Sequence, residues 1–248
     1  SVLVLLCDSW SKFEIIDDAE AIRLQPSIIG ARVNQVLAPF GKKIGPDPAS
    51  INSCKIAGMA ANNSSGMCCG VAQNSYHTVK DMTLIFADGT VLDTADSQSC
   101  NASLQSHSLW VDELMNLVDR VKQNPDLSER IAHKYRLKNT TGYGLNALLD
   151  FSDPIEIIKH LIIGSEGTLA FIADITYHTV VEHKYKHTGF FIFDDISKVC
   201  ELVQRLSGVD VAAVELLDKR ALMSVSEHAI MPKEVASYPE QSAALLIE

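Results

Sequence analysis

The sequence predicts an α+β fold rather than a doubly wound parallel sheet. Strand-like and helix-like segments alternate irregularly, and Asp88-Gly89 joins two strand-like runs as a tight hairpin with a two-residue turn. A polar link, His183–His187, then separates a large first region from a short strand-helix-strand run. A hairpin inside the first region and a β-α-β run after a link indicate one mixed domain and the beginning of a second.

The first region contains most of the predicted elements. Alternating or β-branched apolar runs predict strands, whereas apolar residues that recur every three or four positions predict helices. The predicted strands are Val2–Cys7, Phe13–Ile16, Ala21–Gln25, Met82–Ala87, Val91–Asp93 and Phe171–Val181. The predicted helices are Ile29–Phe40 with Gly41 as its C-cap, a helix start at Ile56–Ala61, Val111–Lys122 ended by Asn124-Pro125, and Pro154–His160 leading into Leu161-Ile162-Ile163.

The region after the link predicts the start of a second domain. Its elements are a strand at Gly189–Phe193, a helix at Ile196–Leu206 and a strand or strand-to-helix junction at Val211–Leu217. The chain opens without a methionine inside a strand-like run and closes in another, Ala243–Glu248. Because strands normally pair with neighbours, we expect a piece of a longer protein, with domains at residues 1–182 and 183–248.

Charge and composition disfavour several classes of partner. The 248 residues carry a formal net charge of −10 and a pI of about 5.2. This charge argues against nucleic acid and anionic membranes, although a locally positive site would still accept an anionic substrate. No continuous apolar run reaches the roughly 18 residues of a transmembrane helix. The cysteines, six in number, do not indicate a disulfide scaffold, and we expect a cytoplasmic location.

A loop crowded with small residues, Gly45–Gly66, is the first candidate for a ligand site. It opens with the rigid turn Gly45-Pro46-Asp47-Pro48-Ala49-Ser50 and continues through Ile56-Ala57-Gly58-Met59-Ala60-Ala61-Asn62-Asn63. Small residues let a backbone approach a bulky ligand, and free N–H groups bind phosphate oxygens. A helix with small residues for tight packing explains the composition equally well. The chain has neither G-x-G-x-x-G nor G-x-x-x-x-G-K-[ST], which disfavours a plain Rossmann NAD site and a P-loop.

A second loop, Gly164–Leu169, interrupts an apolar run with Gly-Ser-Glu-Gly-Thr. Two glycines around Ser-Glu would place backbone amides and one carboxylate at a defined position. Taken alone, the segment is better explained by a simple turn. The two loops together predict a grip on a phosphate-bearing cofactor.

The order of the motifs resembles a known family. The chain carries the Pro-rich turn, the small-residue loop, the Asp-Gly hairpin, Lys138-Asn139-Thr140-Thr141-Gly142-Tyr143 and Gly164-Ser165-Glu166-Gly167-Thr168. This combination resembles the FAD-linked oxidases and dehydrogenases with the vanillyl-alcohol-oxidase (PCMH) type flavin fold. It is most similar to the D-lactate and D-2-hydroxyglutarate dehydrogenases, in particular to long bacterial FAD-linked oxidoreductases that also carry an iron–sulfur region. The resemblance covers Val2 to Val181, and beyond it implies the start of a ferredoxin-like substrate cap.

The resemblance implies FAD as the cofactor and assigns residues to it. The turn lying along the flavin supplies Pro46, Asp47 and Ser50. The loop around the ring and pyrophosphate supplies Cys54, Ile56, Ala57, Gly58, Asn63 and Gly66, with Ala57 where the family usually has glycine. The second loop supplies Gly164, Glu166, Gly167 and Ile172, on the ribose and adenine side or near the ring. Lys138 and Tyr143 match a motif close to the cofactor.

Departures from the family limit what the chain is expected to do alone. Val71-Ala72-Gln73 stands where the family commonly has Arg-Tyr-Gly. By the resemblance, the subdomain with a glycine-rich phosphate loop would precede Ser1. A His-rich motif that supplies metal ligands and a base would follow Glu248, and an iron–sulfur cluster would also lie outside this chain. We therefore expect weak or no retention of FAD by the isolated chain and assign it no catalytic residue.

The implied parent enzyme oxidises a small anionic D-2-hydroxy acid, D-lactate or D-2-hydroxyglutarate, to the 2-oxo acid. A base takes the hydroxyl proton while the α-hydrogen leaves as hydride to the flavin N5. Two alternatives stay open: another substrate class on the same fold, such as oxidation of an alcohol or reduction of an enol ether, and a flavin-free scaffold. The electron acceptor is not indicated, and a homo-oligomer is compatible with the resemblance.

Two further groups of residues contain metal-ligand types, but their spacing argues against a metal site. His178, His183 and His187 are spaced by five and four positions on a strand and link, which does not put three ligands on one face. Cys68 and Cys69 are adjacent, so they cannot easily chelate one ion, and no C-x-x-C partner exists. We expect surface histidines, ordinary thiols and no metal site.

Overall fold

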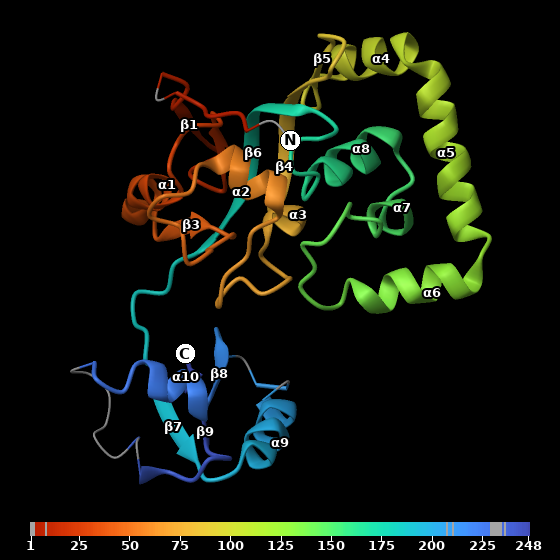
Figure 1. Ribbon diagram of the computed structural model, residues 1–248. Coiled ribbons are helices and arrows are strands. Elements are labelled where there is room, and N and C mark those ends of the chain that lie inside the picture. The colour runs from red at the N-terminus through yellow and green to blue at the C-terminus, as the bar shows by residue number, and fades with distance from the viewer. Residues whose placement is uncertain (1–2, 8, 207, 210, 229–234, 236) are drawn as a thin grey trace. The chain divides into compact units, whose positions relative to one another are not determined.

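An antiparallel sheet built around one long strand, β6 (Phe171–Val181), organises the first part of the chain (Figure 1). The computed structural model describes residues 3–7, 9–206, 208–209, 211–228, 235 and 237–248. The strand order is β1-β2-β6-β4-β5, and β3 pairs with the end of β6 beyond its contact with β2. Strand β6 pairs directly with β2 (Ala21–Leu24), β3 (Lys42–Ile44) and β4 (Val79–Ile85). Strand β1 (Phe13–Ile16) pairs with β2, and β5 (Val91–Asp93) pairs with β4.

Short helices pack their apolar sides against this sheet. They are α1 (Gly30–Leu37) with the 3-10 turn η1 (Ala38–Phe40), α2 (Ile56–Asn62), α3 (Ser75–Thr78), α7 (Ala147–Asp150) and α8 (Pro154–Ile162). Ile56 and Met59 of α2 join Ile175 and Tyr177 of β6 in one buried cluster. Gly41 ends the α1–η1 segment with a φ of 66°, so the predicted C-cap is confirmed.

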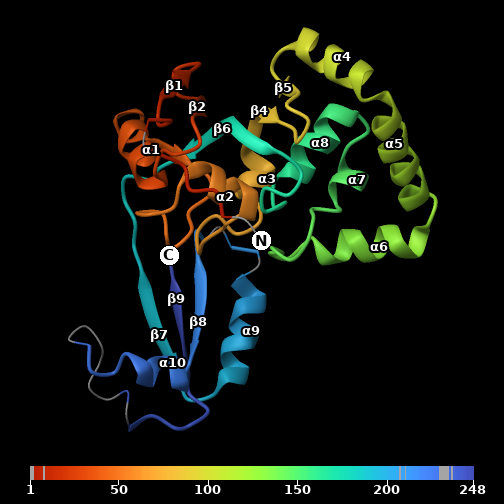
Figure 2. The same cartoon turned by 45° about the horizontal axis from the view of Figure 1, so that its top comes forward.

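A run of three helices, which the sequence predicted only in part, lies beside α7 and α8 (Figure 2). It consists of α4 (Ser97–Ser106), α5 (Ser108–Lys122) and α6 (Pro125–Lys134). Helix α4 escaped prediction because its sequence, SQSCNASLQS, has little apolar periodicity, and the Asp96 side chain caps it instead. Asn124-Pro125 does end α5, but Asn124 also caps α6 by accepting from Leu127 N, and Pro125 is its first residue.

The remaining differences lie at the N-terminus and at the predicted hairpin. Residues Leu3–Cys7 form no strand, so the strand predicted there is wrong for the described part of it. The hairpin of β4 and β5 is confirmed, but the bond from Phe86 N to Thr90 O encloses three residues, 87–89, instead of two. Gly89 supplies the left-handed position with a φ of 87°, as expected for a three-residue loop.

Residues from His183 onward form a separate unit. The chain divides into compact units at Ser1–Glu182 and His183–Glu248, and the boundary falls at the start of the polar link. The second unit contains β7 (Gly189–Phe193), α9 (Ile196–Leu206), β8 (Val214–Asp218), α10 (Lys219–Ser224) and β9 (Ala243–Ile247). Its sheet has the order β7-β9-β8, with both outer strands antiparallel to β9. This arrangement is a split β-α-β unit, and its role as a substrate cap stays a prediction.

The fold class is confirmed as mixed helix and sheet. Within the described part of the chain, no helix combines the length and the apolar character that crossing a membrane requires.

Candidate functional site

Helix α2 forms the platform of the candidate site. Its inner side is buried in the core, whereas Gly58 is exposed and a Cβ added there would meet no atom within 4 Å. The amides of Ile56 and Ala57 donate to Ile28 O at 3.0 Å and to Pro26 O at 3.1 Å. The expectation that the loop presents free N–H groups is therefore wrong for these two residues, which hold α2 to the segment before α1.

The second loop docks on the C-terminal end of α2. Gly164 N donates to Ala60 O at 3.1 Å, and Glu166 N donates to Ala61 O at 2.9 Å. The second bond gives Ala61 O a partner at the end of the helix, whereas Ala60 O also accepts from Asn63 N at 2.9 Å. Asn62 Nδ2 donates to Glu166 Oε1 at 2.6 Å, although the residues are 104 positions apart. The two loops predicted separately from the sequence thus form one continuous surface.

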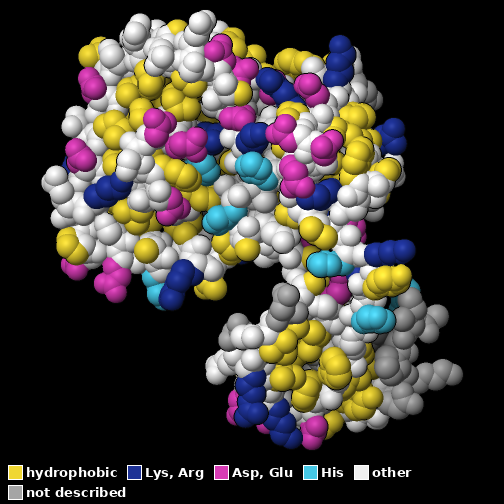
Figure 3. Space-filling model, turned by 180° about the vertical axis from the view of Figure 1, so that it is seen from behind, with side chains coloured by type: hydrophobic (Ala, Val, Ile, Leu, Met, Phe, Trp, Pro, Cys, Tyr) yellow, Lys and Arg dark blue, Asp and Glu magenta, His cyan; other side chains and the backbone are white. Residues whose placement is uncertain are grey.

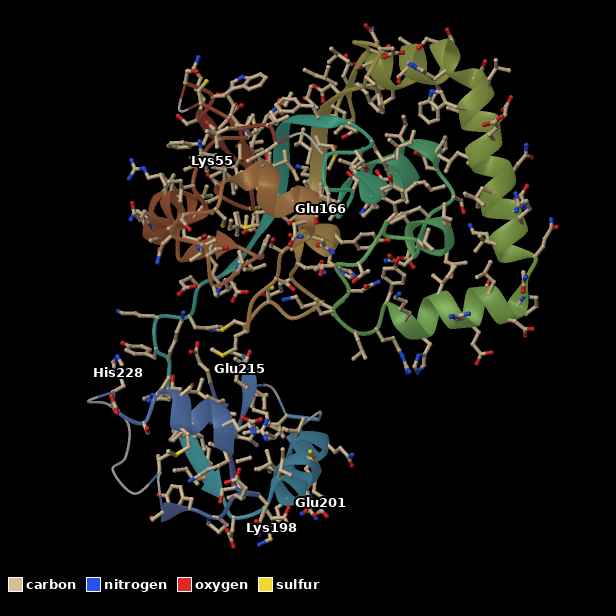
Figure 4. The ribbon with its side chains drawn as sticks, in the orientation of Figure 1. Lys55, Glu166, Lys198, Glu201, Glu215 and His228 are labelled. Atoms are coloured by element: carbon tan, nitrogen blue, oxygen red, sulfur yellow. The ribbon has the colours of Figure 1, made fainter. Side chains whose placement is uncertain are left out.

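Left-handed backbone gives the second loop its shape. Gly164, Glu166 and Gly167 have φ values of 83°, 53° and 72°. Glycine adopts this region freely, but for glutamate it costs about 1 kcal/mol. The docking bonds to α2 hold Glu166 in this conformation and place its exposed carboxylate beside α2 (Figure 4).

A carboxylate fixes the first loop. Asp47 Oδ1 accepts from Gly66 N at 3.0 Å and from Cys69 N at 3.2 Å, while Oδ2 accepts from Cys68 N at 3.1 Å. The backbone approaches so closely that a Cβ on Gly66 would lie 1.9 Å from Asp47 O. Asp47 therefore folds the loop through its side chain, and these three amides are also occupied within the protein.

Cys69 is a buried thiol within this turn. It is 2% exposed, and burial, followed by its hydrogen-bonding contact with Asp47, raises its pKa to about 11. A thiol with a raised pKa is a poor nucleophile and a poor metal ligand at neutral pH. Among the described residues, no group of three or more His, Cys, Asp or Glu side chains is placed to hold a metal ion.

The segment between α6 and α7 touches both loops. Lys138 Nζ donates to Ser65 O at 2.6 Å in the first loop. The hydroxyls of Tyr143 and Thr168 lie 2.9 Å apart, which connects the segment to the second loop. The sequence singled out both residues, and the structure places Lys138 on the first loop and Tyr143 on the second.

A polar cluster behind the first loop was missed by the sequence analysis. Tyr76 N donates to Asn63 Oδ1 at 3.2 Å, and Tyr76 OH donates to Asp150 Oδ2 at 2.7 Å. The ring of His160 stacks on Phe151 with centroids 4.0 Å apart and meets the Tyr76 ring edge-on at 4.7 Å. No local motif marks these residues, because α3, α7 and α8 bring them together.

Burial sets the protonation of this cluster. It raises the pKa of Tyr76, with the bond to Asp150 adding to the effect, and it lowers the pKa of His160. His160 Nδ1 lies 2.8 Å from Glu156 O, so in the neutral ring this nitrogen carries the proton. A hollow of about 550 Å³ adjoins the cluster, and His77, His160 and His178 line it. Histidine side chains gather on this face of the first unit (Figure 3).

The other predicted site residues differ in accessibility. Ile56 and Ile172 are 0% and 4% exposed, so their side chains belong to the core. Pro46 is buried and Cys54 partly buried, whereas Ser50 is exposed and its carbonyl accepts from Cys54 N at 2.8 Å. Direct contact of the Ile56 and Ile172 side chains with a ligand on the open surface is therefore not supported.

Part of the surface of the two loops is open to solvent. Gly58 and Gly167 are exposed, and a Cβ at either would meet nothing within 4 Å, so backbone is accessible on both loops. The Asn62–Glu166 pair adds polar groups between them. Each loop also holds one buried hydroxyl without a hydrogen-bond partner, Ser65 Oγ and Ser165 Oγ, the kind of group that a ligand or an ordered water satisfies.

Comparisons with known proteins agree with this geometry. Residues 1–95 match a family described as FAD binding domain, and these residues include the first loop. Over 215 residues the chain is 22% identical to the D-2-hydroxyglutarate dehydrogenase of Pantoea ananatis, covering 84% of this chain and 20% of that protein. Over 211 residues it is 24% identical to D-lactate dehydrogenase [cytochrome] 1, mitochondrial, of Saccharomyces cerevisiae, covering 83% of this chain and 26% of that protein.

A solved structure shows the same fold. An alkyldihydroxyacetonephosphate synthase superposes with a TM-score of 0.58 at 15% identity, covering 97% of this chain and 37% of the synthase. The chain thus spans only part of the relatives it matches. The predicted resemblance to FAD-linked oxidases and dehydrogenases, the vanillyl-alcohol-oxidase type fold and FAD as the cofactor are confirmed.

Proposed function

We propose, from the FAD binding domain that this chain carries, that the parent protein is an FAD-dependent oxidoreductase acting on a D-2-hydroxy acid. In this proposal the chain supplies the surface that holds the cofactor. The first unit carries the flavin, and the second unit begins the cover over the substrate.

The docking of the second loop on α2 carries the proposal. Two backbone hydrogen bonds and the Asn62–Glu166 bond join the second loop to α2. A simple turn and a tightly packed helix, the two alternative interpretations, do not by themselves predict this contact. The joined surface has backbone open at Gly58 and Gly167, which suits a bulky planar group better than a small ion.

The residues of this surface would divide the work of holding FAD. Gly58 and Gly167 admit the cofactor close to the backbone, while Asn62 and Glu166 offer an amide and a carboxylate at its edge. Asp47 would act on the cofactor indirectly, by fixing the Gly66–Cys69 turn. When bound, FAD supplies the acceptor for the substrate's α-hydrogen, which leaves as hydride.

The relatives support the substrate class. The names of the matched proteins, D-2-hydroxyglutarate dehydrogenase and D-lactate dehydrogenase, both denote oxidation of a D-2-hydroxy acid. The chemistry that these substrates share is a carboxylate next to a secondary alcohol of D configuration. We propose that class for the parent protein, without selecting one acid.

Visible spectroscopy of the purified protein that contains this chain tests the proposal. We expect the absorption band of oxidised flavin, and we expect D-lactate or D-2-hydroxyglutarate, but not the L isomers, to bleach it under anaerobic conditions. A band that these acids leave unchanged and that another alcohol bleaches would replace the substrate class while keeping the flavin. A protein without the band after reconstitution with FAD would overturn the flavin assignment for the chain.

A further inference from the structure

The segment Arg136–Gly144, called the strap below, contacts the two cofactor loops from one side. Lys138 Nζ donates to Ser65 O at 2.6 Å, next to the Gly66 turn that Asp47 fixes. An ammonium-to-carbonyl bond of this length is a strong, charge-assisted hydrogen bond. The strap thus binds the first loop through a backbone carbonyl of that loop.

The other end of the strap grips the second loop. Thr168 Oγ1 donates its own hydrogen to Ser165 O at 2.6 Å, so at the 2.9 Å contact Tyr143 OH is the donor and Thr168 Oγ1 the acceptor. Each hydroxyl therefore has a defined role. The bond fixes Tyr143 against the turn whose amides dock on α2.

The strap itself is anchored at the end of α6. Tyr135 OH donates to Tyr143 O at 2.6 Å and accepts from Leu145 N at 3.1 Å. The tyrosine thus holds the backbone on both sides of Gly144. Helix α6 packs through Ile131 and Tyr135 into a hydrophobic cluster with α5 and α8, so the anchor is rigid.

The space beneath the strap excludes a ligand. A cavity of about 30 Å³ lies there, lined by Asn63, Asn74, Tyr76, Lys138 and Asn139 among others. That volume accommodates an ordered water and no ring or phosphate group. The strap is therefore seated on the protein on this side, where its contacts brace the loops.

We propose that Lys138 and Tyr143 are positioning residues that set the separation of the two cofactor loops. The inference rests on the proposed function, because it assigns the pair a role in holding FAD. Neither residue is taken to touch the reacting atoms. Together they tie Ser65 and Thr168 into one frame, in addition to the bonds that join the two loops at the end of α2.

Amide hydrogen exchange of the 248-residue chain, without added cofactor, tests the bracing. Lys138→Met should raise exchange about tenfold in the second loop, Gly164–Leu169, as well as in the Gly66–Cys69 turn, as expected when one strong hydrogen bond is lost. Tyr143→Phe should likewise raise exchange in the first loop. If each variant loosens only the loop that its own side chain touches, the strap does not couple the loops and the proposal is wrong.

Titration of the full parent protein that contains this chain with FAD tests the consequence for the cofactor. Lys138→Met and Tyr143→Phe should each weaken FAD binding about tenfold while leaving the unfolding temperature nearly unchanged, and Lys138→Arg should restore affinity because it keeps the charged donor. Lys134→Met and Tyr185→Phe are matched controls outside the strap and should bind like wild type. Wild-type failure to bind FAD would count against the proposed function, while the exchange experiment would still decide on the strap; wild-type affinity in both strap variants would overturn the positioning role.

Discussion

The two loops of the candidate site are held in different ways. The first loop depends on a side chain, because the Asp47 carboxylate accepts from the amides of Gly66, Cys68 and Cys69. The second loop depends on backbone, since the amides of Gly164 and Glu166 donate to the end of α2 and its shape comes from residues with positive φ. Substitutions should therefore damage the first loop through lost contacts or steric clashes, and the second loop through altered backbone freedom.

The largest effect is expected at Gly66. Gly66→Ala places a Cβ 1.9 Å from Asp47 O, so the turn must open, and we expect the first unit to lose about 3 kcal/mol of unfolding free energy. Urea unfolding measures this. Gly58→Ala is the matched control: its Cβ has open space, so the helix should gain about 0.5 kcal/mol. The same variant is then tested for FAD binding. Weaker binding by Gly58→Ala would show that the cofactor contacts α2 as proposed.

Removal of the Asp47 carboxylate should have the next largest effect. Asp47→Ala removes the carboxylate that accepts from three amides, of which Gly66 N keeps its contact with Cys69 Sγ at 3.2 Å. Because the turn is also partly exposed to water, we expect a loss of about 2 kcal/mol in the free energy of unfolding. Asp112→Ala, an exposed position on α5, serves as the control and should be nearly neutral. Equal stability of the two variants would show that the first loop does not depend on its side-chain anchor.

Glu166 distinguishes the second loop from the first. Glu166→Gly removes the bond to Asn62 but relieves the left-handed backbone, so stability should stay within about 1 kcal/mol of wild type. Thermal unfolding gives the stability, and a parallel FAD titration reports whether the carboxylate contacts the cofactor. A loss as large as that of Asp47→Ala would mean that both loops rely on side chains.

The pH dependence of the free energy of unfolding should be modest and should originate from His160, in the polar cluster behind the first loop. Because burial lowers the pKa of His160, the unfolded chain takes up a proton below about pH 6.5 that the folded chain does not, so His160 reduces stability as pH falls from 7 to 5. His160→Gln should flatten that slope in urea unfolding. His107 is the control with the opposite sign: its bond to Asp88 raises its pKa, so its contribution is present at low pH and is lost as pH rises through the raised value.

Most of the secondary structure was predictable where local signals are strong. The bounds of β1, β6, β7 and α9 match the predicted ranges, because alternation and helical periodicity are clear in these segments. Helix α4 was missed because a capping aspartate, and not an apolar face, marks its start. The strand predicted at Val2–Cys7 did not form over Leu3–Cys7, since apolar character alone does not supply a pairing partner.

The two loops, their order and the family that they resemble follow from the sequence alone, because glycine placement and short motifs are local properties. How the loops are used depends on contacts made in the folded protein. The fold places the second loop on the end of α2, engages Asp47 with the first loop instead of leaving amides free, and brings Lys138 and Tyr143 across both. These pairings join residues far apart in the chain, so they depend on how the sheet around β6 assembles and leave no signature in any local stretch of sequence.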